Sequence, residues 1–524
     1  MAEWGQRAGA ATELGREFRN VFDVSGVPAF NEFYAYGIFI WKYLYKGYYK
    51  PWHTILAPTI KDQFARRDLE RLNMGKAACQ ELASLVWDEQ CEVNVSQDTD
   101  TEERHPLSDF VHSVLRANNF TVKMQEHIEQ VLALGGGALK VWVDGKHDEE
   151  GNIIPGTEVL RVGYCMADQF VPTTWNNAEV SEGVFVSRQA RDGYYYTRLE
   201  WHKWDGETYY ITNEAYRAEA GNSAEPQDIL GFRYPLGLAF PGIAENTTIQ
   251  GLEHSLFSYY RTPVANNLDD NSPLGVSIYA NALSTLHALD IAFDSFVREF
   301  RLGKKRIIVP VQAMRAVVDP DTGITRRFFD ASDEVYEALA TDDPESLKIR
   351  DDTIELRIEE HVSAINALLN LLCLQLGFSS GTFTFDSQRG VKTATEVISE
   401  DSKTYKTVKA VQTQVAAAVH RLVSEIIDVA SVYGLEFEGQ KIEALARNGW
   451  ECKVTFDDSI LQDRQTNINE GVTLVGAGLM SKKTFLVDKL GMTEEQADIE
   501  IERIKAESGV NGNLLDLMIG SDEG

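Results

Sequence analysis

The sequence lacks any long apolar run: no segment approaches the ~18 consecutive apolar residues that a membrane helix needs. The N-terminus has no apolar segment of the kind that directs secretion. Basic residues are in the minority, with 50 Lys and Arg against 80 Asp and Glu and a formal net charge of −30. Because affinity for phosphate backbones comes from Lys and Arg, this balance argues against a protein that grips nucleic acid, but not against one that handles DNA without gripping it. We expect a protein without a membrane segment, made in a cytoplasm.

Cysteines are few and scattered. The five are Cys79, Cys91, Cys165, Cys373 and Cys452. They form no C-x-x-C pair and no cluster with histidines, which favours reduced thiols that act as small apolar residues and argues against structural zinc. Motifs such as H-E-x-x-H are absent, and Glu359, Glu360 and His361 occupy adjacent helical positions that cannot converge on one ion. The sequence therefore predicts no metal ion and no cofactor.

The first half of the chain reads as one α+β region. With 524 residues and 44% hydrophobic content, the chain is ordered and long enough for two or more structural units. Residues 28–90 read as helical segments, residues 91–104 as a strand and a loop, and residues 106–133 as a helix that ends at Gly135. Alternating apolar positions then predict strands up to about residue 245, with turns at Asp192-Gly193 and Asp205-Gly206.

The second half is dominated by helical periodicity. Apolar residues of 271–302 recur every three or four positions from Ile278 to Phe300, which predicts one long amphipathic helix that ends at Gly303. A β-leaning stretch to about residue 330 follows, and then further long helices over 352–376 and 393–433. The closing segment reads as a strand and short helices, with Ser481 and Thr493 placed as N-caps.

A literal match to the G-x-S-x-G motif of serine hydrolases, GFSSG, surrounds Ser379. A nucleophile elbow needs a strand before the serine and a helix after it. Here the periodicity places a helix before Gly377 and a strand over residues 382–385, and the one histidine downstream, His420, lies in the apolar half of a helix. We interpret the motif as a helix C-terminal turn and predict no catalytic residue.

An aromatic and basic run over residues 41–53, WKYLYKGYYKPWH, allows two interpretations. Its rings could stack on nucleic-acid bases. Stacking platforms normally lie in basic grooves, however, and this chain is acidic, so a packing or subunit-contact surface is favoured.

The order of the segments and the amino-acid sequences of several stretches resemble those of a known family. The stretches are LNMGKAACQELASLVWDEQCEVNV (Leu72 to Val95), SPLGVSIYANALSTLHALDIAFDSFVREFRLGKKRIIVP (Ser272 to Pro310), GFSSGTFTFD and TATEVISEDSKT. From about residue 30 to 507 the chain is similar to the portal proteins of tailed double-stranded DNA bacteriophages, especially those of siphophages and prophages of Gram-positive bacteria.

The resemblance implies an α+β portal fold with a wing, a stem of two long helices, a clip, a tunnel loop and a helical crown. The implied boundaries are 1–271 for the wing, 272–302 for stem helix 1, 303–351 for the clip, 352–377 for stem helix 2, 378–395 for the candidate tunnel loop, 396–459 for the long wing helix and a wing strand, and 460–524 for the crown.

The same resemblance implies a structural, non-enzymatic function. Twelve copies would form a ring at one capsid vertex of the virion, and double-stranded DNA would be packaged and ejected through its channel. The implied partners are the terminase large subunit, which docks on the clip, the head-completion or adaptor protein that replaces it, and the major capsid and scaffolding proteins.

Three sets of residues are candidates for roles in such a ring. In the candidate tunnel loop, Asp386, Gln388, Arg389 and Lys392 would face the lumen, with an ordinary surface loop as the alternative. For Lys304, Lys305 and Arg306, contact with the lumen or clip competes with plain capping of a helix C-terminus. The residues expected to pack the stem are Leu286, Leu289, Phe293, Phe296 and Phe300.

Two long amphipathic helices in one chain leave apolar faces that adjacent copies can cover, as ring interfaces require. Another phage head–tail connector or baseplate protein is the alternative. An enzyme with an unrecognised site is a more distant one.

Overall fold

The computed structural model describes residues 17–18, 20–27, 32–57, 64–96, 105–146, 153–154, 156–177, 179–220, 229–303, 307–308, 315–318, 325–328, 350–351, 355–385, 394–447, 449–457, 473–488, 497, 500–501 and 503. The chain divides into two compact units. Unit 1 comprises Met1–Ile38, Cys79–Ile278 and Gly390–Gly524, and unit 2 comprises Phe39–Ala78 and Tyr279–Arg389. Residues 39–78 of the region expected as the wing, residues 1–271, thus belong to unit 2 together with residues 279–389.

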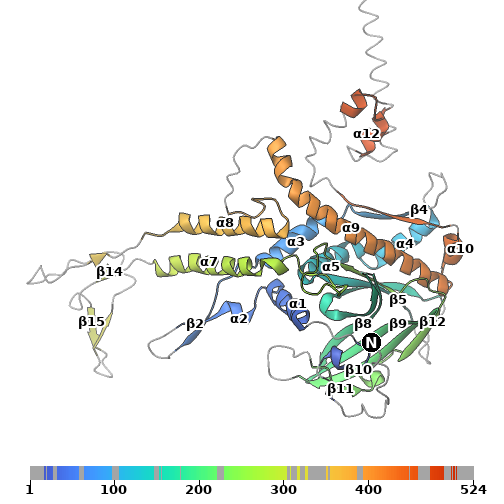
Figure 1. Cartoon of the computed structure of the whole chain (residues 1–524), viewed down its shortest axis with the longest axis horizontal. Coiled ribbons are helices and arrows are strands. Elements are labelled where there is room, and N and C mark those ends of the chain that lie inside the picture. The colour runs from blue at the N-terminus through green and yellow to red at the C-terminus, as the bar shows by residue number, and fades with distance from the viewer. Residues whose placement is uncertain are drawn as a thin grey trace, which may run out of the picture. The chain divides into compact units, whose positions relative to one another are not determined.

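Unit 1 contains a seven-stranded antiparallel sheet, with the order β1-β11-β10-β9-β8-β7 and with β12 paired to β10 (Figure 1). Its strands are β1 (Glu17–Phe18), β7 (Phe170–Asn176), β8 (Glu179–Arg191), β9 (Tyr194–Asp205), β10 (Thr208–Glu219), β11 (Gly231–Tyr234) and β12 (Asn246–Gln250). The turn between β8 and β9 is the predicted Asp192-Gly193, with positive φ at both residues (53° and 78°). Such turns match the twist of the strands that they join.

Unit 1 also contains a three-stranded sheet, β13-β5-β6, and several helices. The strands are β5 (Gly136–Asp144), β6 (Val159–Met166) and β13 (Phe257–Arg261), and the longest helices are α4 (Pro106–Ala117), α5 (Phe120–Leu134) and α9 (Ala394–Val432). The long helix predicted over residues 393–433 is confirmed. Its C-terminal half is buried on all sides from Leu422 to Ile427, because it packs on β5, β13 and α10 (Ile442–Ala446).

The helix predicted over residues 106–133 is instead two helices, α4 and α5. Asn119 adopts a left-handed conformation (φ 50°) between them. The side chain of Asn118 donates to the carbonyl oxygens of Val114 and Leu160 and accepts from the amide of Val162. The side chain of Asn118 therefore ends α4 and also satisfies backbone groups at the outer edge of β6. It competes with the helix for backbone hydrogen bonds, and the apolar periodicity of the sequence does not reveal such competition.

The main sheet of unit 1 is covered on one face by the segment that precedes α1 (Glu32–Tyr45). Phe18, Val21, Val24 and Val27 are buried in one cluster, together with apolar residues of β7 to β10. The smaller elements of the unit are the β4–β20 pair (Glu92–Ser96 and Glu451–Thr455), the β18–β19 pair (Glu436–Phe437 and Gln440–Lys441), α6 (Leu236–Ala239) and α12 (Lys482–Asp488). Ser481 caps α12 as predicted, since its hydroxyl accepts from the amide of Thr484; Thr493 lies outside the described residues.

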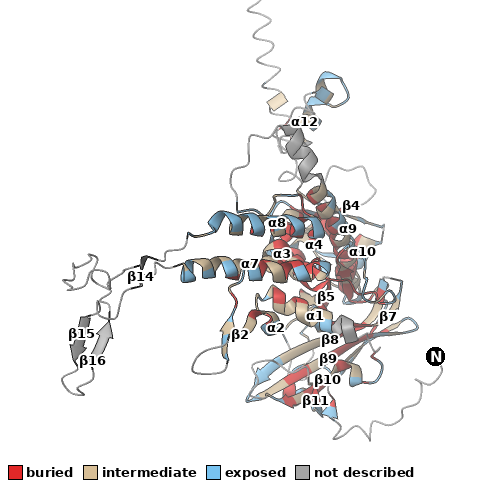
Figure 2. Ribbon diagram, turned by 60° about the vertical axis from the view of Figure 1, so that its left-hand side comes forward, coloured by how far each residue is buried: buried red, intermediate tan, exposed pale blue. Residues whose placement is uncertain are grey.

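Unit 2 is built on two antiparallel helices, α7 (Leu283–Leu302) and α8 (Ile358–Leu376), which lie side by side (Figures 1 and 2). The N-terminal part of the unit contributes α2 (Lys50–His53) and a hairpin of β2 (Thr54–Ala57) and β3 (Ala65–Asp68). Beyond the helix pair lie two short strand pairs, β14 with β17 (Ile307–Ile308 and Arg350–Asp351) and β15 with β16 (Arg315–Val318 and Thr325–Phe328). Two of the described helices cross between the units: α1 runs from unit 1 into unit 2, and α3 (Met74–Val86) runs from unit 2 into unit 1.

Three sequence predictions are wrong in this region. Residues 54–57 and 65–68, predicted to be helical, form a hairpin. The helix predicted over 271–302 begins at Leu283, after the single turn 280–282, because residues 272–278 are held in unit 1: the amide of Ile278 donates to Leu132 and the hydroxyl of Thr262 donates to Val276. The helix predicted from residue 352 begins at Ile358.

Candidate functional site: the paired helices of unit 2

The helices α7 and α8 run antiparallel, and the C-terminal end of α7 lies beside the N-terminal end of α8. Arg357 donates two hydrogen bonds to Glu299 (3.1 and 2.9 Å), and the rings of Phe296 and His361 are 6.0 Å apart. The hydrogen bonds from Arg357 lower the pKa of Glu299 to about 2, so this carboxylate stays charged at neutral pH. The inner face of the pair holds Leu286, Leu289, Ile365, Leu369, Leu372 and Leu376, all buried.

The five residues expected to pack the stem are divided along α7. Leu286 and Leu289 are buried, Phe293 and Phe296 are half-buried, and Phe300 is 44% exposed. The three rings follow one another along the helix, with centroids 6.5 and 5.1 Å apart. The burial of this row therefore declines steadily toward the C-terminal end of α7.

A second face of α7 is acidic and faces the N-terminal part of unit 2. Asp294 accepts two hydrogen bonds from Arg67 (2.6 and 2.9 Å) and a third from the amide of Glu70. One turn earlier, Asp290 accepts from the amide of Leu72 (2.9 Å). These contacts fasten the hairpin and the segment after it along α7.

His53 completes the contact at Asp290. The imidazole Nδ1 lies 2.8 Å from the amide of Tyr49 and accepts its hydrogen, so the proton of the neutral ring is on Nε2, which donates to Asp290 at 3.1 Å. Partial burial acts to raise the pKa of Asp294, but the hydrogen bonds from Arg67 outweigh it and lower the pKa. The sequence reasoning did not single out Asp290 and Asp294, because acids four residues apart on a helix are typical of a solvated face.

A third face of the helix pair is exposed and partly apolar. On α8 the exposed positions Glu360, Ala364, Ala367, Leu371 and Leu374 recur with spacings of four, three, four and three. Leu371 is 43% and Leu374 is 62% exposed. On α7 the corresponding exposed row is Ser284, Ile291, Ser295, Arg298 and Leu302. We call these two rows the outer stripe; their seven-residue repeat is the spacing that packs against another helix.

The G-x-S-x-G motif lies in the turn that follows α8. Gly377 has a left-handed conformation (φ 86°) and its amide donates to Cys373, so it ends the helix as predicted. Ser379 is 3% exposed and follows the helix α8, where a nucleophile elbow needs a strand. The geometry of a nucleophile elbow is therefore missing.

Residues 381–385 form turns and bends, not the predicted strand. They fold back on α8, where Asn370 accepts from the amide of Gly381 and Asn366 from the amide of Phe385, both at 2.9 Å. The signal that was missed is this pair of asparagines four residues apart on a helix, which can bind a returning chain.

Other sequence candidates lie outside the described residues. These are Asp386, Gln388, Arg389 and Lys392 of the candidate tunnel loop, and Lys304, Lys305 and Arg306 after α7. In the aromatic and basic run, Trp41 and Tyr49 are buried, at 1% and 6% exposure, and the half-buried Trp52 stacks on the ring of His287 with centroids 4.8 Å apart. That burial favours packing over the stacking of bases.

Unit 1 contains a buried charged network that the sequence reasoning also missed. Glu200 accepts from Lys140 (2.9 and 2.8 Å), from Arg198 (2.7 Å) and from His202 Nε2 (3.0 Å). Burial acts to raise the pKa of Glu200, but these donors outweigh it and lower the pKa. Burial lowers the pKa of His202, so its neutral ring donates to Glu200 and accepts from Tyr209 at 2.7 Å. Because each of these side chains has a hydrogen-bond partner within the network, we interpret the network as part of the core.

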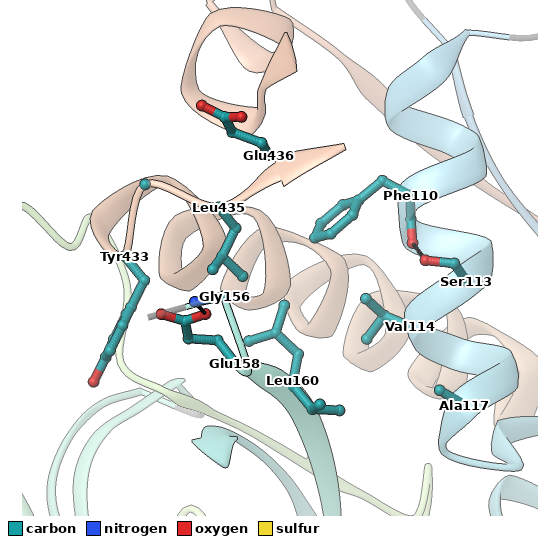
Figure 3. Close-up of a pocket in the computed structure, with 12 residues that line it drawn as sticks. Phe110, Ser113, Val114, Ala117, Gly156, Glu158, Leu160, Tyr433, Leu435 and Glu436 are labelled. Carbon is teal, nitrogen blue, oxygen red and sulfur yellow. Dashed lines mark hydrogen bonds between the residues drawn. The ribbon is translucent and has the colours of Figure 1, made fainter. Parts of the chain in front are cut away.

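A cavity of about 580 Å³ lies in unit 1 between α4, the start of β6 and the residues that follow α9 (Figure 3). Phe110, Val114, Leu160 and Leu435 supply apolar lining, and the carboxylates are those of Glu158 and Glu436. Ser113 donates to the carbonyl of Phe110 (2.7 Å), and no histidine lines the cavity. It therefore offers no acid–base or nucleophilic constellation. In the part of the chain that the structure describes, no cluster could hold a metal ion and no helix could cross a membrane.

Comparison with known proteins places the chain. A solved structure of the neck of an empty GTA particle aligns with 80% of this chain and 89% of its own, with a TM-score of 0.40 and 11% identity. No curated protein matches. The family model described as "Phage portal protein, SPP1 Gp6-like" matches residues 38–511. The chain therefore belongs to the SPP1 Gp6-like family of phage portal proteins, a structural component of the virion.

Proposed function

We propose that copies of this portal protein close side by side into a ring, twelve in the assembled capsid, at a single vertex. Double-stranded DNA passes through the axial channel of the ring during packaging and again during ejection. The segment 303–351 is the clip, on which the terminase large subunit docks first and a head-completion protein docks after packaging. The major capsid and scaffolding proteins surround the ring during assembly.

The outer stripe of α7 and α8 is the observation that supports the ring. Each helix uses one face for its partner, and α7 uses a second for Arg67 and the hairpin. The third face keeps Leu371, Leu374 and Ile291 in water, at 43%, 62% and 47% exposure. A head-to-tail contact, in which the stripe of one copy packs against a different face of the next, buries these side chains and repeats until the ring closes.

The charge of the chain suits a conduit. Each copy carries a net charge of −30, so we expect carboxylates on the channel wall that faces the phosphates of DNA. Since tight binding of DNA needs several Lys or Arg contacts to phosphate, an acidic wall lets the duplex slide without sticking. No catalytic step belongs to this function: the portal family is structural, and Ser379 lies in a helix-ending turn.

The experiment substitutes Leu371→Glu and Leu374→Glu together and measures particle mass by light scattering after size exclusion. The matched control is Val122→Glu, which adds the same kind of charge at an exposed apolar position of another helix, α5. We expect the wild type and the control to form large particles and the double variant to remain small, with an unchanged circular dichroism spectrum. A double variant that assembles like the wild type would remove the support that the stripe gives to the ring.

A further inference from the structure

At one end of the seven-stranded sheet, two arginines lie over tyrosine rings on the same face. Arg191 of β8 is 4.7 Å from the ring centroid of Tyr196. Arg217 of β10 lies between two rings, 4.7 Å from that of Tyr194 and 4.6 Å from that of Tyr234. The strand register places these residues on one face, because Arg191 opposes Tyr194, Tyr196 opposes Arg217, and positions two apart share a face. In this acidic chain, such a pairing of cations and aromatics needs an explanation.

The guanidinium of Arg217 contacts two tyrosine rings but has no carboxylate partner among the described residues. The rings of Tyr194 and Tyr234 lie 4.7 and 4.6 Å from its Cζ, and a cation that contacts aromatic rings keeps its N–H groups as hydrogen-bond donors. Among the described residues no carboxylate forms an ion pair with it and no acceptor takes its hydrogen bonds. Its neighbours differ in this respect: Arg198 pairs with Glu200 at 2.7 Å and Arg233 pairs with Glu214 at 3.1 Å. Arg217 is therefore a pre-oriented donor without an acceptor.

Exposed apolar side chains flank the two arginines. Phe232 opposes Arg217 directly in the register of β10 and β11 and is 49% exposed. Leu238 is 64% exposed, and its carbonyl accepts from Arg191 at 3.3 Å, which places it on the other side. We call Arg191, Arg217, Phe232 and Leu238, with their supporting tyrosines, the arginine–tyrosine patch. Arg, Tyr and Phe are the residue types enriched where proteins bind one another.

We propose that the arginine–tyrosine patch docks an acidic segment of a partner protein. One carboxylate of the segment accepts two parallel hydrogen bonds from the edge of Arg217, and a neighbouring carboxylate meets Arg191. Apolar side chains beside these carboxylates cover Phe232 and Leu238. The planar fork of arginine matches the two oxygens of a carboxylate, and stacking on tyrosine fixes the fork before the partner arrives. A guanidinium held in this way loses little freedom on binding.

A protein segment fits the patch better than DNA does. The two arginines stand among the exposed carboxylates of Glu17, Asp192 and Glu219, and Asp192 forms a long, exposed ion pair with Arg191 at 3.7 Å. A phosphate backbone carries one charge per ~1.7 Å of duplex, so it would meet these carboxylates as well as the arginines. A peptide can place its carboxylates only where the arginines lie.

The test measures fluorescence anisotropy of a labelled peptide of alternating Glu, Leu and Ser, added to the full-length protein. Arg217→Gln is expected to weaken binding at least about ten-fold, as for a central arginine of an interface. Arg217→Lys keeps the charge and loses the fork, so we expect most of the same loss. Phe232→Ser, at an exposed position that leaves the fold intact, is expected to weaken binding about three-fold or more. The matched control is Arg233→Gln, an arginine next to Tyr234 that already has a carboxylate partner.

Each result bears on the proposal. Binding of the Glu peptide that depends on Arg217 and not on Arg233, with no binding of a Gln version of the peptide, supports it. Three results would overturn it: no binding of the Glu peptide at millimolar concentration, equal binding by the Arg217→Gln protein, or tighter Arg217-dependent binding of a duplex DNA probe. The circular dichroism melting curve of each variant shows whether a loss of binding comes from misfolding.

Discussion

His127 is a buried histidine whose hydrogen bonds fix its protonation. Its Nε2 donates to the carbonyl of Cys165 (3.1 Å), and its Nδ1 accepts from the hydroxyl of Tyr260 (2.9 Å). Burial lowers its pKa to about 4, although the hydrogen bond to Cys165 acts in the opposite direction. The ring is therefore neutral in the folded protein at neutral pH.

This state of His127 makes the stability of unit 1 depend on pH. In the unfolded chain the ring has an ordinary pKa of ~6.5. Below that pH the unfolded state therefore binds a proton that the folded state does not bind. We expect the free energy of unfolding to fall as the pH drops from 6.5 to 4, by up to ~1.4 kcal/mol per pH unit for this one group. In His127→Gln this component of the slope should be gone, as measured by urea unfolding at several pH values. Parallel curves for the two proteins would show that His127 is not the group responsible.

The ion pair of Arg67 and Asp294 is the second prediction at this scale. Asp294 is nearly buried and takes three hydrogen bonds, so Asp294→Asn leaves Arg67 without its charged partner. We expect a loss of about 1–3 kcal/mol in the free energy of unfolding. The control is Asp144→Asn, whose pair with Arg161 is long (3.4 Å) and half-exposed and should cost less than ~0.5 kcal/mol. Equal losses in the two variants would contradict the account.

Gly135 allows the C-terminal end of α5 to pack closely against the backbone of another segment. This residue ends α5 with φ 93°, and a Cβ placed on it would lie 2.5 Å from the carbonyl oxygen of Gly275. The carbonyl oxygen of Gly135 accepts a hydrogen bond from the amide of Thr262 (3.0 Å). The segment 272–278 can therefore lie against the end of α5 only if both residues lack side chains.

A pair of alanine substitutions separates conformational strain from this contact. Gly193 also has a positive φ (78°), but no atom lies within 4 Å of the point that a Cβ would occupy, so Gly193→Ala should cost about 1–2 kcal/mol. Gly135→Ala carries the same strain and also displaces Gly275, and we expect it to cost at least ~2 kcal/mol more. The midpoint of urea unfolding compares the two. A similar shift of the midpoint in both variants would mean that the backbone at Gly275 moves away from the new Cβ at little cost in free energy.

Long periodic elements could be predicted from the sequence, and contacts between distant segments could not. The helix of residues 393–433 and the end of α8 at Gly377 were predictable because periodicity and a helix-ending glycine are local signals. The start of α7 was misplaced because the apolar residues before it, such as Ile278, serve the core of unit 1 with helix-like spacing. Asp290 and Arg217 were missed because their partners, such as Leu72 and Tyr194, lie on other elements that local patterns do not connect to them.

At the scale of the molecule, apolar attraction and electrostatic repulsion oppose each other in the ring. Each copy carries a net charge of −30, so neighbouring copies repel, while the outer stripe, in the proposed ring, would draw them together. Repulsion between exposed charges is screened by salt, since the Debye length falls from ~30 Å at 0.01 M to ~8 Å at 0.15 M. Burial of apolar side chains is not weakened in this way.

Assembly should therefore become stronger as salt is added. We expect the fraction of protein in large particles, measured by mass photometry, to rise between about 0.01 and 0.15 M NaCl. In the same range, binding of the Glu peptide to the arginine–tyrosine patch should weaken, because that contact joins opposite charges. Dissociation of the particles by added salt would show that ion pairs, and not the stripe, hold the copies together.

The rotational symmetry of the purified particle tests the central claim most directly. Averaged electron micrographs, together with native mass spectrometry of the same sample, give the number of copies and show whether they surround an opening. The account predicts a closed ring with a single mass, an integral number of chains and an axial hole wide enough for double-stranded DNA. A monodisperse single chain that persists at high concentration and in salt would contradict it.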